Sequence, residues 1–185
     1  PRVSQPLLLR PLTLKGLTLR NRIAVSPMCQ YSAVDGVAQD WHLVHLGRFA
    51  LGGAGLVFVE ATGVEARGRI SPGDMGLWND EQARALARIA EFLKANGSAA
   101  GIQLAHAGRK GSTQRPWDGG GPLTAADGAA GESPWETLAP SALPFTEGWQ
   151  RPKAMSRAAA AKARVTGPPK IAKPSTAPMK GAVAK

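Results

Sequence analysis

The chain has 185 residues and a formal net charge of +10. This length suffices for one domain with a real core, but it falls short of the roughly 250 residues of a complete (β/α)₈ barrel. The charge is uneven, because residues 1–150 hold 14 Lys/Arg against 13 Asp/Glu, whereas residues 151–185 hold 9 Lys/Arg and no acid. The body is therefore close to neutral, which disfavours a nucleic-acid-binding domain, and the basicity belongs to the tail.

The single cysteine, Cys29, excludes an internal disulfide framework and a cysteine-based zinc site. A reducing compartment is the simplest setting. The sequence has no run of 18 apolar residues, so we expect no transmembrane helix and no membrane partner. The first residues lack the apolar core of a signal peptide, and we therefore expect a cytoplasmic protein.

Three apolar segments predict strands, at residues 23–26, 55–62 and 99–105. The first is expected to be buried and to stop at Pro27, which has no N–H to give to a ladder. The polar loop that follows it carries a thiol, an amide and a phenol, and it lies at the carboxyl end of the strand. Ligands bind at that end in parallel α/β folds. The second segment opens with an unbroken apolar run, typical of strands that are covered on both faces.

Helical spacing of apolar residues predicts two helices between these strands. The first is expected to begin with Asp40 as its N-cap and to end at the glycine pair 52–53. The second is expected to begin at residue 79 or 80 and to end at Asn96-Gly97, where glycine supplies a left-handed stop. The resulting β-α-β-α-β order predicts a parallel sheet.

The segments around this unit have less regular patterns. Alternating leucines on both sides of Lys15-Gly16 predict a small hairpin over residues 12–19. Residues 111–150 are rich in Gly and Pro and predict a long loop excursion with a short hairpin. Residues 156–185 consist mainly of Ala, Lys, Pro and Gly, and we expect them to be disordered apart from a weak helix at 157–164.

Two motifs have plain structural explanations. His42 and His45 have the i, i+3 spacing of a ligand pair, but the sequence places no third ligand beside them, so we expect no metal site. The glycine-rich stretch 52–55 follows a helix and precedes a strand, which is the reverse of a phosphate-binding turn. It is interpreted as a helix stop.

Two polar residues leave alternatives open. A lone cysteine such as Cys29 is most often a small buried hydrophobe, whereas at a strand end it can also tune a cofactor. Gln103 lies in the middle of an apolar strand, where a buried amide needs a partner. That partner is either a core hydrogen-bonding group or a ligand with paired donor and acceptor atoms, such as the pyrimidine edge of a flavin.

Three separated motifs resemble the old yellow enzyme family. They are Ser-Pro-Met-Cys-Gln-Tyr at 26–31, Val-Glu-Ala-Thr at 59–62 and Gln-Leu-Ala-His-Ala-Gly-Arg at 103–109. The form of the first motif is similar to that of bacterial ene-reductases and xenobiotic reductases. The resemblance covers about residues 7–155 and implies the N-terminal half of an FMN-dependent NAD(P)H oxidoreductase built on a (β/α)₈ barrel. Members of this family reduce activated alkenes such as enones by hydride transfer from the reduced flavin.

The resemblance also implies roles for nine residues. Six are implied to contact FMN: Ser26, Pro27, Met28, Cys29, Ala61 and Gln103. Tyr31 is implied to face the substrate, and His106 and Arg109 are implied to shape the cleft beyond the third strand. NAD(P)H is the implied co-substrate, and full-length family members often form oligomers.

The sequence departs from the family after about residue 155. The His pair that grips the substrate carbonyl and the phosphate site of the later strands have no counterpart, so no catalytic residue is assigned. We expect residues 1–155 to form about three of the eight barrel strands and to bind FMN weakly or not at all. The alternative is a non-catalytic fragment whose basic tail, residues 156–185, binds nucleic acid or anionic surfaces without specificity. That tail has no interleaved aromatics, which makes nucleic-acid binding the weaker hypothesis.

Overall fold

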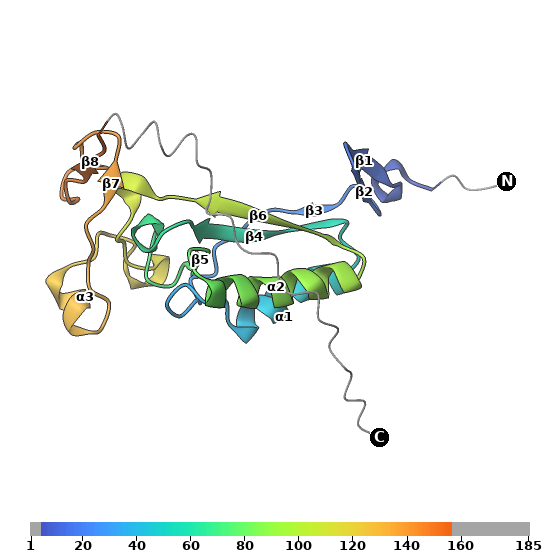
Figure 1. Ribbon diagram of the computed structural model, residues 1–185, viewed down its shortest axis with the longest axis horizontal. Helices are drawn as coiled ribbons and strands as arrows, with labels where there is room; N and C mark the ends of the chain where they lie inside the picture. The colour runs from blue at the N-terminus through green and yellow to red at the C-terminus, as the bar shows by residue number, and fades with distance from the viewer. Residues whose placement is uncertain (1–4, 157–185) are drawn as a thin grey trace, which may run out of the picture.

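The computed structural model describes residues 5–156, and Figure 1 shows their arrangement. The tail and its weak helix, apart from Ser156, lie outside the described residues. At the centre is a parallel sheet formed by β3 (Ala24–Val25), β4 (Leu56–Gly63), β5 (Met75–Gly76) and β6 (Ala99–Ala105). β6 pairs with one edge of β4, while β3 and β5 pair with the two ends of its other edge.

Two helices cover one face of this sheet. α1 (Asp40–Leu51) follows β3, and α2 (Asp80–Ala95) follows β5. Figure 1 shows both helices on the same side of β4 and β6. The predicted β-α-β-α-β order and the parallel sheet are therefore confirmed, whereas the short strand β5 was not predicted.

The core fills the space between the sheet and the two helices. Its buried side chains come from β4, β5, both helices and the adjoining loops: Ala33, Leu46, Ala50, Ala54, Val57, Val59, Met75, Ile89 and Leu93. Burial of a side chain as large as Leu or Ile stabilises the fold by about 1.5–3 kcal/mol. The helix-facing side of the sheet therefore holds most of the apolar stabilisation.

The ends of the helices show which residues begin and end them. The expectation that Asp40 caps α1 is wrong, because the N-cap is Gln39, one residue earlier. Gln39 and His42 form a reciprocal capping box. Asp40 instead pairs with Arg88 of α2, at 2.7 Å. α2 begins as expected, since the Asn79 side chain accepts the backbone N–H of Gln82 at 2.9 Å.

The other face of the sheet is more open than the sequence suggests. β3 is only two residues long, and Ala24 is exposed rather than buried. Gln103 of β6 is exposed too, so the expectation of a buried Gln103 is wrong. The physical reason is that the helices cover only one face, so the apolar runs of the strands are not evidence that both faces are covered.

Short elements flank the sheet at both ends. The predicted hairpin is confirmed as β1 (Leu12–Leu14) paired antiparallel with β2 (Leu17–Leu19). The excursion contains α3 (Ala125–Ala129) and β7 (Leu138–Ala139), and β7 pairs in parallel with β8 (Lys153–Ala154). An antiparallel bridge between Thr113 and Pro122 agrees with the short hairpin that was expected in this segment. The 3₁₀ helices are Leu7–Leu9, Ala66–Gly68, Gly108–Lys110 and Pro116–Asp118. Within residues 5–156, none of the helices combines the length and apolarity needed to cross a membrane.

Candidate functional site

A β-bulge in β4 organises the carboxyl end of the sheet. Val59 pairs with Ile102, but the next pair is Ala61 with Gln103, so Glu60 is an extra residue on β4. Bulges of this kind change the direction of the side chains that follow them.

The bulge places Ala61 on the sheet face opposite the helices. Val57 and Val59 belong to the helix-side core, and strict alternation would put Ala61 there as well. Ala61 is instead level with Gln103, which follows the core-facing Ile102 and therefore lies on the other face of β6. The methyl group of Ala61, which is 7% exposed, and the exposed amide of Gln103 thus lie side by side on the sheet face opposite the helices.

The loop after β3 lies against this bulge. The backbone N–H of Gln30 donates to Oε1 of Glu60 at 3.0 Å. The backbone N–H of Ala61 forms a hydrogen bond with the thiol of Cys29, which by itself lowers the pKa of that thiol. The structure therefore brings Cys29 to Ala61, and Ala61 to Gln103, although the three residues come from three separate segments.

Burial raises the pKa values of three acidic groups in this region. Burial, together with the charges of Asp74 and Glu60, raises the pKa of Cys29 to about 11, so its thiol stays protonated. Burial also raises the pKa of Glu60 to about 7, against the opposing hydrogen bond from Gln30. Asp74, whose pKa is likewise raised by burial, accepts the backbone N–H of Ile70 at 2.7 Å.

The remaining residues that are implied to contact FMN lie at the end of β3. Ser26 and Met28 are exposed, and Pro27 is half-buried. The side chain of Gln103 makes no hydrogen bond to any of residues 5–156, so its amide is open to a partner. These positions agree with a common ligand face, although their roles stay predictions.

Tyr31 is held by the excursion. Its ring meets the ring of Trp117 edge-on, with the centroids 5.7 Å apart. Its carbonyl accepts Nε–H of Arg115 at 3.2 Å. Neither Arg115 nor Trp117 was predicted as a site residue, because the excursion has no periodic pattern that would place it beside the first loop.

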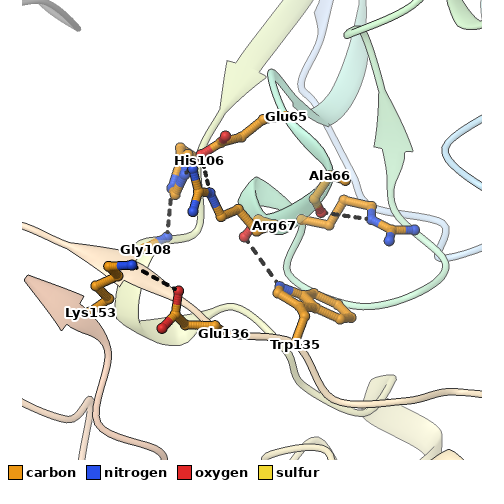
Figure 2. Close-up of polar contacts among 9 residues, drawn as sticks. Glu65, Ala66, Arg67, His106, Gly108, Trp135, Glu136 and Lys153 are labelled. Carbon is orange, nitrogen blue, oxygen red and sulfur yellow. Dashed lines mark hydrogen bonds and ion pairs between the residues drawn. The ribbon is translucent and has the colours of Figure 1, made fainter. Parts of the chain in front are cut away.

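His106 and Glu65 connect the loops beyond β4 and β6, as Figure 2 shows. Nε2 of His106 lies 2.9 Å from Oε1 of Glu65, while its Nδ1 accepts the backbone N–H of Gly108 at 3.1 Å. Partial burial opposes the ionisation of Glu65, but hydrogen bonds from Arg67 and His106 outweigh it and lower the pKa of this carboxyl. Both nitrogens of His106 are thus engaged, and the residue joins the loops that follow β4 and β6.

The excursion also contacts the loops that follow β4 and β6. In Figure 2 the indole of Trp135 donates to the carbonyl of Arg67, at 3.2 Å, and Lys153 approaches Glu136 at 3.8 Å. Arg109 is also directed to the excursion, since its Nη2 donates to Oγ of Ser141 at 3.1 Å. Arg109 therefore links the loop after β6 to the excursion.

The histidine pair of α1 does not form a ligand set. His42 is fully buried and uses Nδ1 to accept the backbone N–H of Gln39. His45 uses its Nδ1 with Arg48 at 3.3 Å. Within residues 5–156 there is no cluster of three or more His, Cys, Asp or Glu that could hold a metal ion.

Sequence reasoning missed the two buried carboxylates, Glu60 and Asp74, each 2% exposed. For Glu60 a signal was present, because it is the single charged residue of β4 and interrupts an apolar run. A charge at such a position is costly unless it is hydrogen-bonded, so it marks a position to examine.

Comparisons with known proteins agree with this geometry. Residues 7–162 match the sequence profile of the NADH:flavin oxidoreductase / NADH oxidase family. An NADPH dehydrogenase from Geobacillus thermodenitrificans is 44% identical over 153 residues, which are 82% of this chain and 39% of the relative. An NADPH dehydrogenase from Listeria monocytogenes is 46% identical over 148 residues, covering 79% of this chain and 38% of the relative.

Solved structures show the same fold. Morphinone reductase matches 86% of this chain and 42% of its own, with a TM-score of 0.64 and 26% identity. Old Yellow Enzyme from Pichia sp. AKU4542 matches 85% of this chain and 40% of its own, with a TM-score of 0.68 and 24% identity. The chain thus spans about two fifths of the length of these proteins, and it matches part of their structure. By sequence it belongs to the NADH:flavin oxidoreductase family that includes old yellow enzyme.

Proposed function

We propose that residues 1–155 supply the N-terminal part of an FMN site in an NAD(P)H oxidoreductase of the ene-reductase type, acting on activated alkenes such as enones. One observation carries this proposal. The bulge at Glu60 sets Ala61 level with Gln103 on the open face of the sheet, beside the thiol of Cys29.

The residues on this face suit a flavin. A flat ring needs a surface without bulky side chains, and Ala61 provides only a methyl group. The pyrimidine edge needs a donor and an acceptor together. The amide of Gln103, which has no hydrogen bond to residues 5–156, has both. The thiol of Cys29 stays neutral, so it offers a weak S–H donor rather than a negative charge.

When FMN is bound, it supplies the hydride chemistry, with NAD(P)H as the co-substrate, and the protein supplies binding and orientation. Cys29, Ala61 and Gln103 would hold the ring, and Ser26 to Met28 would line its border. Tyr31, stiffened by Trp117, would face the alkene. His106 and Arg109 would keep the loops at the cleft edge in place.

A flavin titration of the 185-residue chain tests this proposal. Because the proposed contacts are to the ring, we expect weak quenching of flavin fluorescence, with riboflavin and FMN bound about equally. Gln103→Ala removes the amide and should weaken both by about tenfold, as expected for the loss of paired hydrogen bonds. Gln5→Ala, at the far end of the chain, is the matched control. The absence of any quenching at millimolar flavin would contradict the proposal.

The reaction class has its own test. NADPH oxidation should rise when 2-cyclohexenone is added to the flavin-loaded chain, and the consumed enone should appear as the saturated ketone. NADPH oxidation that is indifferent to the enone would argue against the ene-reductase assignment while leaving flavin binding intact.

A further inference from the structure

Glu60 is a buried carboxylate to which the family resemblance assigns no role. It is 2% exposed and forms no ion pair with a basic side chain among residues 5–156. A buried charge without a counter-ion is unfavourable for folding. A carboxylate in this otherwise apolar stretch of β4 therefore calls for a role that offsets this cost.

The carboxylate meets the backbone of the loop after β3. Oε1 of Glu60 accepts the N–H of Gln30 at 3.0 Å, and a hydrogen bond from the backbone N–H of Tyr31 also favours its ionised form. A single side chain of β4 therefore receives backbone donors from consecutive residues of the loop.

This loop has a conformation that needs such support. Tyr31 has a φ of +52°, in the left-handed region that side chains rarely adopt. Its backbone is also closely packed, because a Cβ built on Gly73 would lie 2.2 Å from the Tyr31 carbonyl oxygen. Unfavourable backbone conformations persist only where the surrounding structure fixes them.

We propose that Glu60 is a positioning residue whose buried carboxylate holds the loop from Met28 to Tyr31 against the bulge of β4, so that Cys29 and Ala61 form one ligand-facing surface. Glu60 has both roles. As the extra residue of the bulge it turns Ala61 to the open face, and its carboxylate binds the loop. Only the identity of the ligand rests on the proposed flavin function; the positioning itself concerns contacts within the chain.

The same carboxylate also influences the thiol. The titratable groups that act on Glu60 and Cys29 are Asp74, on the loop before β5, and Tyr31, on the loop after β3. An ionised Glu60 opposes formation of the Cys29 thiolate, whereas a neutral Glu60 does not. The reactivity of Cys29, the one cysteine of the chain, therefore reports on its distance from Glu60.

Hydrogen exchange of the full chain tests the positioning directly. Glu60→Ala should speed amide exchange at Gln30 and Tyr31 by about tenfold, as expected for the loss of a buried hydrogen bond. Glu60→Gln keeps an acceptor oxygen and should restore protection. Glu91→Gln, on the exposed face of α2, is the matched control. Unchanged exchange in Glu60→Ala would overturn the proposal.

The rate of Cys29 labelling gives a second test of the proposal. It uses Glu60→Gln, so it applies even if Glu60→Ala does not fold. We would measure the rate with the neutral reagent 4,4′-dithiodipyridine across pH. The ratio of the Glu60→Gln rate to the wild-type rate should be one well below pH 7 and rise to about threefold above it, because only wild type gains the opposing charge. Superimposed profiles would refute the proposal. Neither hydrogen exchange nor thiol labelling needs flavin. If both give the expected results but the chain binds no flavin, the proposed function is rejected and the positioning role of Glu60 stands.

Discussion

Single residues at the bulge explain how an apolar strand becomes one side of a candidate ligand site. Ala61 would belong to the helix-side core if β4 alternated strictly, and the extra residue Glu60 moves it to the face of Gln103. The motif around Ala61 was visible in the sequence. The sheet face on which the Ala61 side chain lies could not be predicted, because a bulge arises from the pairing of two strands that lie far apart in the chain.

The ionisation of Glu60 should be visible in the pH dependence of stability. Its pKa is about 7 in the folded chain, against an ordinary value of 4.5. The folded state therefore keeps a proton that the unfolded state has released, and stability falls as the pH rises from 4.5 through 7. Glu60→Gln cannot ionise, so it should unfold like wild type below pH 4.5 and be more stable by about 1–3 kcal/mol above pH 8.

Urea unfolding at both pH values measures this difference. Asp74 also has a raised pKa, so the comparison of the two chains, rather than either curve alone, isolates Glu60. A stability difference that is the same at both pH values would show that Glu60 does not titrate as described.

At the scale of elements, the helices were the most predictable part of the fold. Their apolar spacing follows from the local sequence, and Gly97, with a φ of +76°, ends α2 where its residue type indicates. β5 and α3 were missed because two paired residues and a five-residue helix show no period. The depth of burial of Gln103 was also mispredicted, since it depends on what covers the sheet rather than on the strand itself.

The two-layer core makes a clear prediction about stability. Leu93 of α2 is fully buried between the helices and the sheet, whereas Leu51 at the end of α1 is 68% exposed. Leu93→Ala should lower the free energy of unfolding by about 2–5 kcal/mol. The matched change Leu51→Ala should cost less than about 0.5 kcal/mol. Equal losses in urea titrations would mean that α2 does not pack on the sheet as described.

The start of α2 gives a smaller but separate effect. Asn79 accepts the backbone N–H of Gln82, so Asn79→Ala should lower stability by about 1 kcal/mol. Asn79→Ser keeps a capping oxygen and should recover most of the loss. If thermal unfolding of the two variants is indistinguishable, the cap contributes nothing.

At the scale of the whole molecule, the described residues form one covered and one open side. α1 and α2 cover one face of the parallel sheet, as Figure 1 shows, and the other face carries the exposed side chain of Gln103. The candidate flavin-facing residues lie in the carboxyl halves of β4 and β6 and in the loop after β3. Figure 1 shows the excursion next to that end of the sheet. The family resemblance predicted this end as the site, while the attachment of Tyr31 to Arg115 and Trp117 required the tertiary structure.

The most direct test of the account is the effect of Ala61→Leu on flavin binding, measured by fluorescence quenching of the full chain. Because the bulge places this side chain on the ligand face, the larger residue should block binding. The chain should then no longer quench the fluorescence of either riboflavin or FMN. Ala95→Leu, at the exposed end of α2, should leave both titrations unchanged. Flavin binding that survives Ala61→Leu in a chain with native circular dichroism would contradict the placement of the site.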